Sequence, residues 1–381
     1  KGTKVIFNSS SGGSSRLLYT GTGEESNRIL EFRKDGIVEQ GGASGNLKFT
    51  SAVLSSGSLT LRLRGATAGT GEIAGNIPSS TAVNKAGSGT WYLTASNLYS
   101  GVTTVEAGNL VLSGTNGAIR ASSGLSLAGG SFVLLNSATT NNADRLADSI
   151  PITLNGGTFC FSNDLTAASF SETAGALLVN SGASTVTVTQ APEGQTSALR
   201  FASIIHINDG TVNFTGIGLG DSGSDRTRIF ITGQGDGLIG SWATVNGTRY
   251  AAYSSTRGVY AAPESVDIAA RGYSVITNDA TLLARINLPG EDGPIVLETS
   301  PVSSVGSLIQ NSDTPAVVTT TNTLFKLAEI VLAAGKASLT VGTVPREGTL
   351  STLSPGGSLS LENNSADNVL TVNASVVNNT S

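Results

Sequence analysis

The sequence predicts an all-β protein that folds as a right-handed parallel β-helix (β-solenoid), in a single elongated domain. Glycine turns recur between short strand-like segments in steps of 22, 27, 25 and 28 residues, at Gly108, Gly130, Gly157, Gly182 and Gly210. Val, Leu and Ile alternate with polar residues in many short runs, as in half-buried strands. A repeat of 20–30 residues built of strands and turns is one coil of a solenoid, and such coils bury their interior only by stacking.

The first segment, residues 1–86, is predicted to form N-terminal coils. Its strands are expected at Lys4–Phe7, Arg16–Tyr19, Asn27–Phe32, Gly36–Glu39 and Asn46–Phe49. Clusters of Gly, Ser and Thr separate these runs and supply the turns.

The second segment, residues 87–260, carries the clearest repeat. Strands are expected at Trp91–Thr94, Thr103–Glu106 and Leu110–Leu112. In successive units, asparagines stand just before the turn glycines, at Asn155, Asn180 and Asn208. Stacked coils would align such residues into a ladder of hydrogen-bonded amides, so we expect them to have a structural role together with the turn glycines.

Two segments depart from the strand pattern. Residues 136–149 form the longest break, and Asn142 there is expected to cap a short helix over Ala143–Asp148. Residues 324–335 have helical apolar spacing between strand-like neighbours, which leaves helix and strand equally open. The rest of the third segment, residues 261–381, is predicted to form C-terminal coils.

Composition excludes several functions. The net charge of −5 disfavours a nucleic-acid partner, whose phosphates need a basic surface. No stretch approaches 18 apolar residues, so no membrane-spanning helix is expected. Cys160 is the only cysteine, so an internal disulfide is impossible, and its place between two phenylalanines predicts a buried side chain.

Carboxylates near the irregular loop are the candidates for catalysis. Asp144, Asp148 and Asp164 lie there with Arg145, and pairs of carboxylates serve glycoside hydrolysis as acid and base. However, no Asp-rich strand recurs across successive coils, as a calcium-bearing enzyme face would need. We therefore expect no enzyme and no catalytic residue.

Glycine-rich turns hold the candidates for calcium, Asp221, Asp225 and Asp236. The glycine-aspartate nonapeptide of calcium-binding β-rolls does not repeat here, so no cofactor is expected beyond this option. His206 is the only histidine and lies between Ile205 and Ile207. If these isoleucines point inward, strand alternation turns His206 to solvent, away from a catalytic role.

The stretch 87–114 resembles the autotransporter-associated β-strand repeat proteins. The matching residues are Asn97, Tyr99, Gly101, Thr103, Thr104, Val105, Gly108, Leu110 and Leu112. Segments 144–162 and 240–259 are similar to units that lie between and after those repeats. The resemblance implies a β-helical passenger that is secreted and displayed at the surface of a bacterium.

The sequence as a whole favours an extracellular structural protein that forms a surface stalk, sheath or head-to-tail fibre. Its expected partners are copies of itself stacked end to end, or further coils of a longer parent chain. Two alternatives stay open. One is an adhesin passenger that binds glycans or neighbouring cells, and the other is a polysaccharide lyase or hydrolase on the same scaffold.

Overall fold

The computed structural model confirms the predicted β-solenoid: short strands stack in mostly parallel sheets, and the described residues contain no helix. The structure describes residues 3–9, 13–137, 139–163, 169–189, 196–223, 226–263, 265–355 and 357–379. The chain divides into two compact units, Lys1–Gly233 and Gln234–Ser381. The subdivision into 1–86, 87–260 and 261–381 stays a prediction.

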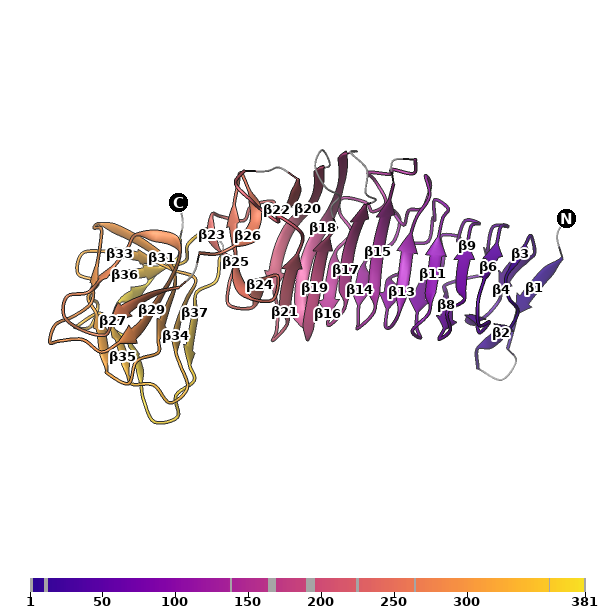
Figure 1. Ribbon diagram of the computed structural model, residues 1–381. Helices are drawn as coiled ribbons and strands as arrows, with labels where there is room; N and C mark the ends of the chain where they lie inside the picture. Colours follow the sequence, from indigo (N-terminus) through magenta and orange to yellow (C-terminus); the bar gives the residue numbers. More distant parts are fainter. Residues whose placement is uncertain are drawn as a thin grey trace. The chain divides into compact units, whose positions relative to one another are not determined.

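Coils of the first unit stack through parallel sheets, whose strands lie side by side in Figure 1. One of these sheets has ten strands among the described residues: β2 (Ser15–Tyr19), β5 (Gly36–Gln40), β8 (Leu59–Gly65), β10 (Thr81–Lys85), β12 (Thr103–Val105), β14 (Leu125–Leu127), β16 (Ile152–Asn155), β18 (Ser169–Ser181), β20 (Thr196–His206) and β22 (Thr227–Ile231).

A second parallel face of this unit consists of β3 (Glu24–Ser26), β6 (Asn46–Phe49), β9 (Thr70–Ile73), β11 (Thr90–Leu93), β13 (Asn109–Leu112), β15 (Ser131–Asn136), β17 (Thr158–Asn163), β19 (Ala183–Val188) and β21 (Thr211–Thr215). A third, short face consists of β1 (Lys4–Phe7), β4 (Ile29–Phe32) and β7 (Leu54–Ser55).

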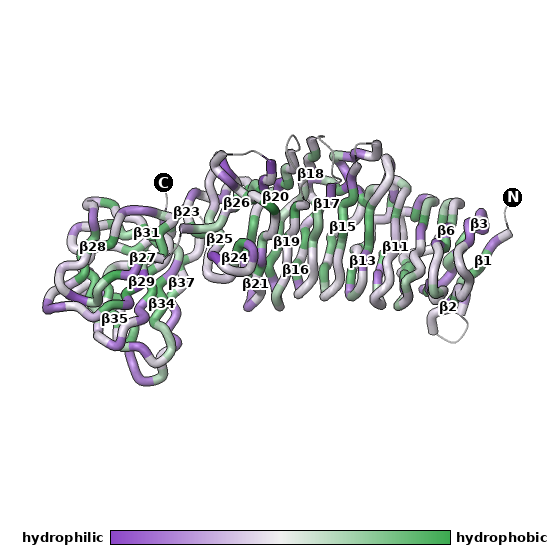
Figure 2. The backbone as a smooth tube through the Cα atoms, in the orientation of Figure 1, coloured by the Kyte–Doolittle hydropathy of each residue, from purple (hydrophilic) through white to green (hydrophobic). Residues whose placement is uncertain are grey.

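Parallel register lines up equivalent side chains from coil to coil, and each inward position becomes a column of core residues. Phe132, Phe159 and Val186 form part of one such column and are fully buried. Gly71 belongs to the same column through Trp91 and Leu110, and a Cβ on Gly71 would lie 2.4 Å from the Trp91 ring of the next coil. Figure 2 shows hydrophobic stretches that recur in neighbouring coils of the first unit.

The second unit begins with antiparallel strands, β23 (Gly237–Leu238), β24 (Ala243–Val245), β25 (Arg249–Ser254) and β26 (Gly258–Ala261). Asn246 and Gly247 join β24 to β25 with φ values of 50° and 69°, the left-handed conformation that tight hairpins need. The prediction of unbroken parallel coils is therefore wrong over 237–261, because a hairpin reverses the chain there.

Parallel coils follow from residue 266. One set of paired strands comprises β27 (Val266–Ala269), β29 (Asp279–Leu288), β31 (Val302–Gln310), β33 (Leu324–Lys326), β34 (Glu329–Leu332), β36 (Thr349–Ser351), β37 (Ser360–Asn363) and β39 (Ser375–Val376). The other faces are β28 (Val275–Ile276) with β30 (Val296–Leu297), and β32 (Ala316–Val318), β35 (Leu339–Val341) and β38 (Leu370–Val372).

The predicted helix over Ala143–Asp148 is wrong, and the open choice between helix and strand over 324–335 falls to strand. Asn142 accepts a hydrogen bond from the Asp144 amide (3.0 Å), but this closes a local turn and no helix follows over Ala143–Asp148. Residues 324–335 form β33 and β34, which pair with β31 of the preceding coil. The core of neighbouring coils therefore overrides the local helical spacing.

The predicted turn glycines occupy crowded positions. Gly108 and Gly182 have φ values of 63° and 64°, and a Cβ on Gly157 would lie 2.7 Å from the Gly130 carbonyl oxygen. Similar crowding applies at Gly130, where a Cβ would lie 2.6 Å from Val105, and at Gly210, where it would lie 2.7 Å from the Ser181 amide. Glycine thus allows the turns of successive coils to approach closely.

One step of the glycine repeat differs from the expected stacking. Gly182 lies against Gly156 of the preceding coil, with 3.2 Å between a Cβ on Gly182 and the Gly156 Cα. The register between β16 and β18 shifts there, since Leu154 pairs with Val179 while Asn155 pairs with Ser181. Asn180 is the additional residue, a β-bulge that displaces this turn.

Replacing Phe159 by alanine should destabilise the first unit by about 3–5 kcal/mol, because the ring is fully buried and packs 6.2 Å from Phe132 and 6.0 Å from Phe201. Urea unfolding followed by circular dichroism measures this change. The adjacent Thr158→Ala variant, on the outward face, should stay within about 0.5 kcal/mol. Equal effects of the two variants would contradict the column arrangement.

Candidate functional site: polar side chains that join the coils

Two polar residues, Lys85 and Thr103, occupy core columns of the ten-stranded sheet. Lys85 pairs in register with Leu63 of one neighbouring coil and Val105 of the other, and it is fully buried. Its ammonium group donates to the carbonyl oxygens of Ala86 (3.1 Å), Gly87 (2.5 Å) and Ala107 (2.9 Å). Burial lowers the pKa of Lys85 to about 8, and the three carbonyls satisfy its three donors.

Thr103 is the second polar residue in a core column, between Val83 and Leu125. Its hydroxyl forms hydrogen bonds with the Tyr99 hydroxyl (2.8 Å) and the Ser122 hydroxyl of the next coil (3.1 Å). All three hydroxyl residues are buried, and burial raises the pKa of Tyr99. Together they form a closed polar chain that spans two coils.

Asn97 connects three successive coils through one side-chain amide. Its Oδ1 accepts a hydrogen bond from the Ile77 amide (3.2 Å), and its Nδ2 donates to the carbonyls of Ala95 (2.8 Å) and Ala118 (3.1 Å). The side chain is 2% exposed. A few residues on, a Cβ at Gly101 would lie 2.7 Å from the Ala82 Cα, so the backbones approach closely there.

The three asparagines proposed as a ladder lie next to one another. Asn208 Nδ2 donates to Asn180 Oδ1 (2.7 Å), and Asn180 Nδ2 donates to Asn155 Oδ1 (2.7 Å). Asn155 Nδ2 in turn donates to the Ser126 hydroxyl (3.3 Å). This row links four successive coils at the surface, whereas Asn97 acts in the interior.

Arg145 and Glu172 form an inter-coil connection that sequence reasoning missed. Glu172 accepts the backbone amides of Arg145 and Leu146, each at 3.1 Å. The Arg145 guanidinium donates to Asn136 Oδ1 (2.9 Å) and to the Gly117 carbonyl (2.7 Å). Burial raises the pKa of Glu172 to about 7, although the hydrogen bonds from the two backbone amides lower it. No local pattern marks either residue as buried.

Two of the catalytic candidates of this loop, Asp144 and Asp148, are exposed. Asp144 pairs with Arg120 at 3.0 Å, and Asp148 is exposed, whereas Asp164 lies outside the described residues. Arg145 is fully buried, so its guanidinium faces carbonyls and not solvent.

The calcium candidates belong to different parts of the protein. Asp221 lies in the first unit, Asp236 in the second, and Asp225 outside the described residues. Asp236 Oδ1 accepts the Ser255 amide at 2.7 Å. Across the described residues, no group of three or more His, Cys, Asp or Glu side chains is arranged to hold a metal ion.

His206 is exposed, and its Nε2 lies 2.9 Å from the Gly210 carbonyl oxygen. Ile205 and Ile207 are also exposed, at 47% and 50%, so neither isoleucine points into the core as the sequence argument supposed. Cys160 is partly exposed, which corrects its predicted burial: Phe159 and Phe161 occupy the inward positions on either side.

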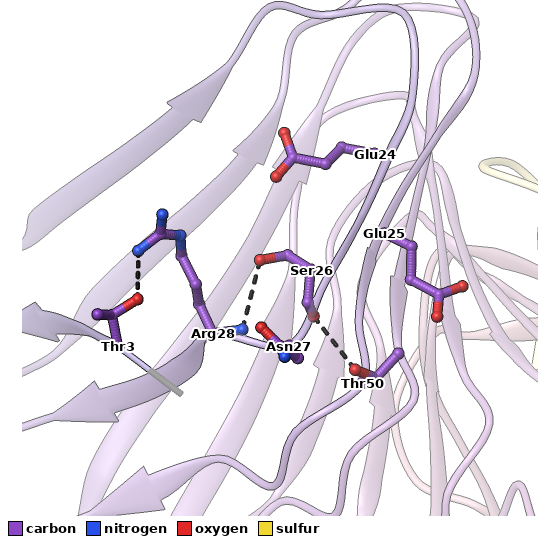
Figure 3. A pocket seen from close by; sticks show the side chains of 7 residues that line it. All are labelled: Thr3, Glu24, Glu25, Ser26, Asn27, Arg28 and Thr50. Atoms are coloured by element: carbon purple, nitrogen blue, oxygen red, sulfur yellow. Dashed lines mark hydrogen bonds between the residues drawn. The ribbon is translucent and has the colours of Figure 1, made fainter. Parts of the chain in front are cut away.

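A polar hollow of about 480 Å³ near the start of the first unit is the cavity drawn in Figure 3. Arg28 Nη1 donates to the Thr3 hydroxyl (2.5 Å), and Glu25 pairs with Lys48 (3.4 Å). Glu24 and Glu25 extend in different directions in Figure 3, as neighbouring residues of a strand do.

A corresponding carboxylate joins two coils of the second unit. Glu347 accepts hydrogen bonds from the hydroxyls of Thr319 (2.6 Å) and Thr343 (2.5 Å), and also from the Thr321 hydroxyl and the Thr343 amide. Burial alone would raise the pKa of Glu347, but these hydrogen bonds outweigh it and hold the pKa well below its ordinary value.

Parallel coils joined by buried polar side chains define a β-solenoid protein. Comparison with protein families matches residues 83–112 to the passenger-associated-transport-repeat. These residues include Lys85, Asn97, Tyr99 and Thr103. The match and the solenoid around it confirm the predicted resemblance to autotransporter passenger repeats, and together they indicate an autotransporter passenger domain. Searches of curated proteins and of solved structures gave no match.

Replacing Asn97 by alanine should destabilise the first unit by about 2–4 kcal/mol, because the buried Ile77 amide loses its acceptor and the Ala118 carbonyl keeps only the backbone amide of residue 97. Asn208→Ala provides the matched control: it removes one exposed amide hydrogen bond and should cost under about 1 kcal/mol. Chemical unfolding of the two variants measures the difference. A larger cost for the Asn208 variant would show that the surface ladder, and not Asn97, holds the coils.

Replacing Glu172 by glutamine should change how stability depends on pH. The pKa of Glu172 is about 7 in the folded chain and near 4.5 when unfolded, so between these values the folded state binds more protons. Wild-type stability should therefore fall as pH rises from about 4.5 to about 7, by on the order of 3 kcal/mol relative to Glu172→Gln. Urea unfolding at a series of pH values measures this difference.

Glu347→Gln is the control, because its dependence should have the opposite sign. The lowered pKa of Glu347 means that its stabilising contribution is present above about pH 4.5 and is lost as pH falls below that value. The Glu347 variant should thus differ most from wild type at neutral pH. Parallel pH profiles for the two variants would contradict the assignment of Glu172 as the protonated group.

Proposed function

We propose that this chain is an extracellular structural segment of a bacterial surface passenger, with a mechanical and not a catalytic role. Its stacked coils would supply length to a stalk, sheath or fibre. The observation that carries the proposal is the set of polar side chains, above all Asn97, that bind one coil to the coils on both sides. The family match at 83–112 supports a secreted or surface-held location.

Resistance to force and to proteases follows from this arrangement. Backbone hydrogen bonds between parallel coils run along the direction in which coils stack, so separation of two coils breaks several bonds at once. The chain has only 22 Lys and Arg residues in 381, which leaves few sites for trypsin-like proteases. It has no Met, so methionine oxidation cannot disturb its core.

Further coils, from another copy or from a longer parent chain, are the proposed partners. Among the described strands, β1, β2 and β3 are edge strands of their sheets. Ile6 on β1 and Leu18 on β2 are 47% and 46% exposed. Exposed edge strands with apolar side chains are templates for strand pairing, so we place the contact with the next coil here.

Electron microscopy and analytical sedimentation of the purified chain test this assignment. We expect rods that lengthen with protein concentration, and at least a tenfold loss of rods in an Ile6→Lys, Leu18→Lys double variant. Leu98→Lys is the control, since Leu98 is 56% exposed and is not on an edge strand. Wild-type chain that stays monomeric at all concentrations would exclude end-to-end assembly, and rapid trypsin digestion of folded chain would exclude the mechanical role.

An adhesin is the second candidate, favoured by one surface feature. The outward positions of the second parallel face carry a row of hydroxyl and amide side chains, including Thr70, Thr90 and Asn109. Thr90 accepts a hydrogen bond from Asn109 at 3.1 Å, so the row is ordered. A regular polar row suits many weak contacts to an extended glycan. Binding on a glycan array that Thr70→Val and Thr90→Val weaken together would favour the adhesin over the structural role.

A further inference from the structure

A cleft of about 590 Å³ lies in the second unit, where the antiparallel strands meet the parallel coils. The hairpin strand β25 contributes Arg249 and Tyr250, and β29 contributes Leu283 and Arg285. Ser265, from the segment before β27, is also part of the lining. The cleft thus combines two guanidinium groups, one aromatic ring, an apolar side chain and a neutral hydroxyl.

Arg249 is the unusual member of this set. Its Nε is buried and has no hydrogen-bond partner among the described residues. A buried donor without an acceptor costs roughly 1–3 kcal/mol, and such groups in folded proteins call for an explanation. The Arg249 guanidinium therefore has a donor that no described residue uses.

The charge of the cleft favours an anion. None of its described lining residues carries a carboxylate, although the whole chain has a net charge of −5. Arg285 is held in place by Asp267, with 2.7 Å between Nε and Oδ1. Asp267 also accepts a hydrogen bond from Asn287 (3.1 Å), so its charge is shared between two donors. Asp267 balances the charge of Arg285, so Arg249 supplies the net positive charge of the described lining residues.

The remaining lining residues suit a sugar ring. Tyr250 packs on an apolar cluster that includes Leu283 and Tyr260, which fixes one face of its ring. Aromatic and aliphatic walls contact the C–H face of a sugar, while Ser265 and Asn311 offer neutral hydrogen-bonding groups for its hydroxyls. Asn311 is oriented by a hydrogen bond from its Nδ2 to Asn287 Oδ1 (2.8 Å).

We propose that this cleft binds a carboxylated sugar of the uronate type, with the carboxylate between Arg249 and Arg285 and the ring against Tyr250 and Leu283. Arginine binds carboxylates through two parallel hydrogen bonds, which gives geometric selectivity as well as attraction. A site of this kind is independent of the mechanical role, and either can fail without the other.

Calorimetric titration of the full chain with digalacturonate, and in parallel with the neutral disaccharide of galactose, tests the proposal. We expect saturable digalacturonate binding, at least tenfold weaker binding of the neutral sugar, and at least a tenfold loss of digalacturonate affinity in Arg249→Gln. Lys336→Gln is the charge-matched control, since Lys336 is paired with Asp313 at the surface of the same unit and does not line the cleft. Its affinity should equal that of wild type.

Four results would overturn the proposal. The first is the absence of digalacturonate binding by folded wild type, and the second is equal binding of the neutral sugar. The third is sulfate competing as well as digalacturonate, which would mean a general anion site. The sequence also places Glu264 between two lining residues. If Arg249→Gln and Glu264→Gln cost stability non-additively in the absence of sugar, Arg249 has its partner within the chain and the proposed site is lost.

Discussion

The register between successive coils is the constraint on which the rest of this structure depends. Each strand satisfies its backbone donors and acceptors on the strand one coil away, so a coil has no stable arrangement apart from its neighbours. Register also decides which side chains meet inside. Phe132, Phe159 and Val186 form a column for this reason. Glycine is needed at position 71 because the Trp91 ring of the next coil fills the space that a side chain there would occupy.

Polar residues in these columns are explained by the same constraint. Lys85 and Thr103 stand where their neighbours along the column are Leu and Val, yet each has its hydrogen-bonding groups satisfied by the adjacent turn or coil. An unsatisfied polar group at either position would be costly, so these residues fix which coil can lie next to which. A column of apolar side chains alone would allow many different coils to stack on one another. The buried polar residues thus hold neighbouring coils together and also determine the order in which the coils stack.

Much of this could be predicted from the sequence, because alternation and turn glycines are local signals. These signals alone predicted the strands Lys4–Phe7 and Asn46–Phe49 with the bounds that the structure has. The side chains that join the coils were harder. Asn155, Asn180 and Asn208 repeat beside turn glycines and could be found, whereas Arg145 and Glu172 are buried only because a coil 27 residues away covers them.

Other features depended on signals that compete with each other. The Asn246-Gly247 pair is a hairpin signal, but the surrounding strand pattern masks it in a chain rich in glycine turns. The bulge at Asn180 adds one residue without changing composition. The spacing of the glycines therefore predicted that Gly182 stacks on Gly157, whereas it lies against Gly156. The cleft around Arg249 could not be foreseen, since three separate strands supply its walls.

The pairing of Ser131 with Thr158 has a consequence for how such a protein can change in size. Residues 27 positions apart hold equivalent places, so excision of the segment 131–157 would rejoin the chain at matching points and leave every remaining column continuous. Loss of a single residue within a strand would instead invert inside and outside for all that follows it in that strand. Gene duplication or deletion can therefore change the length of this molecule only by whole coils.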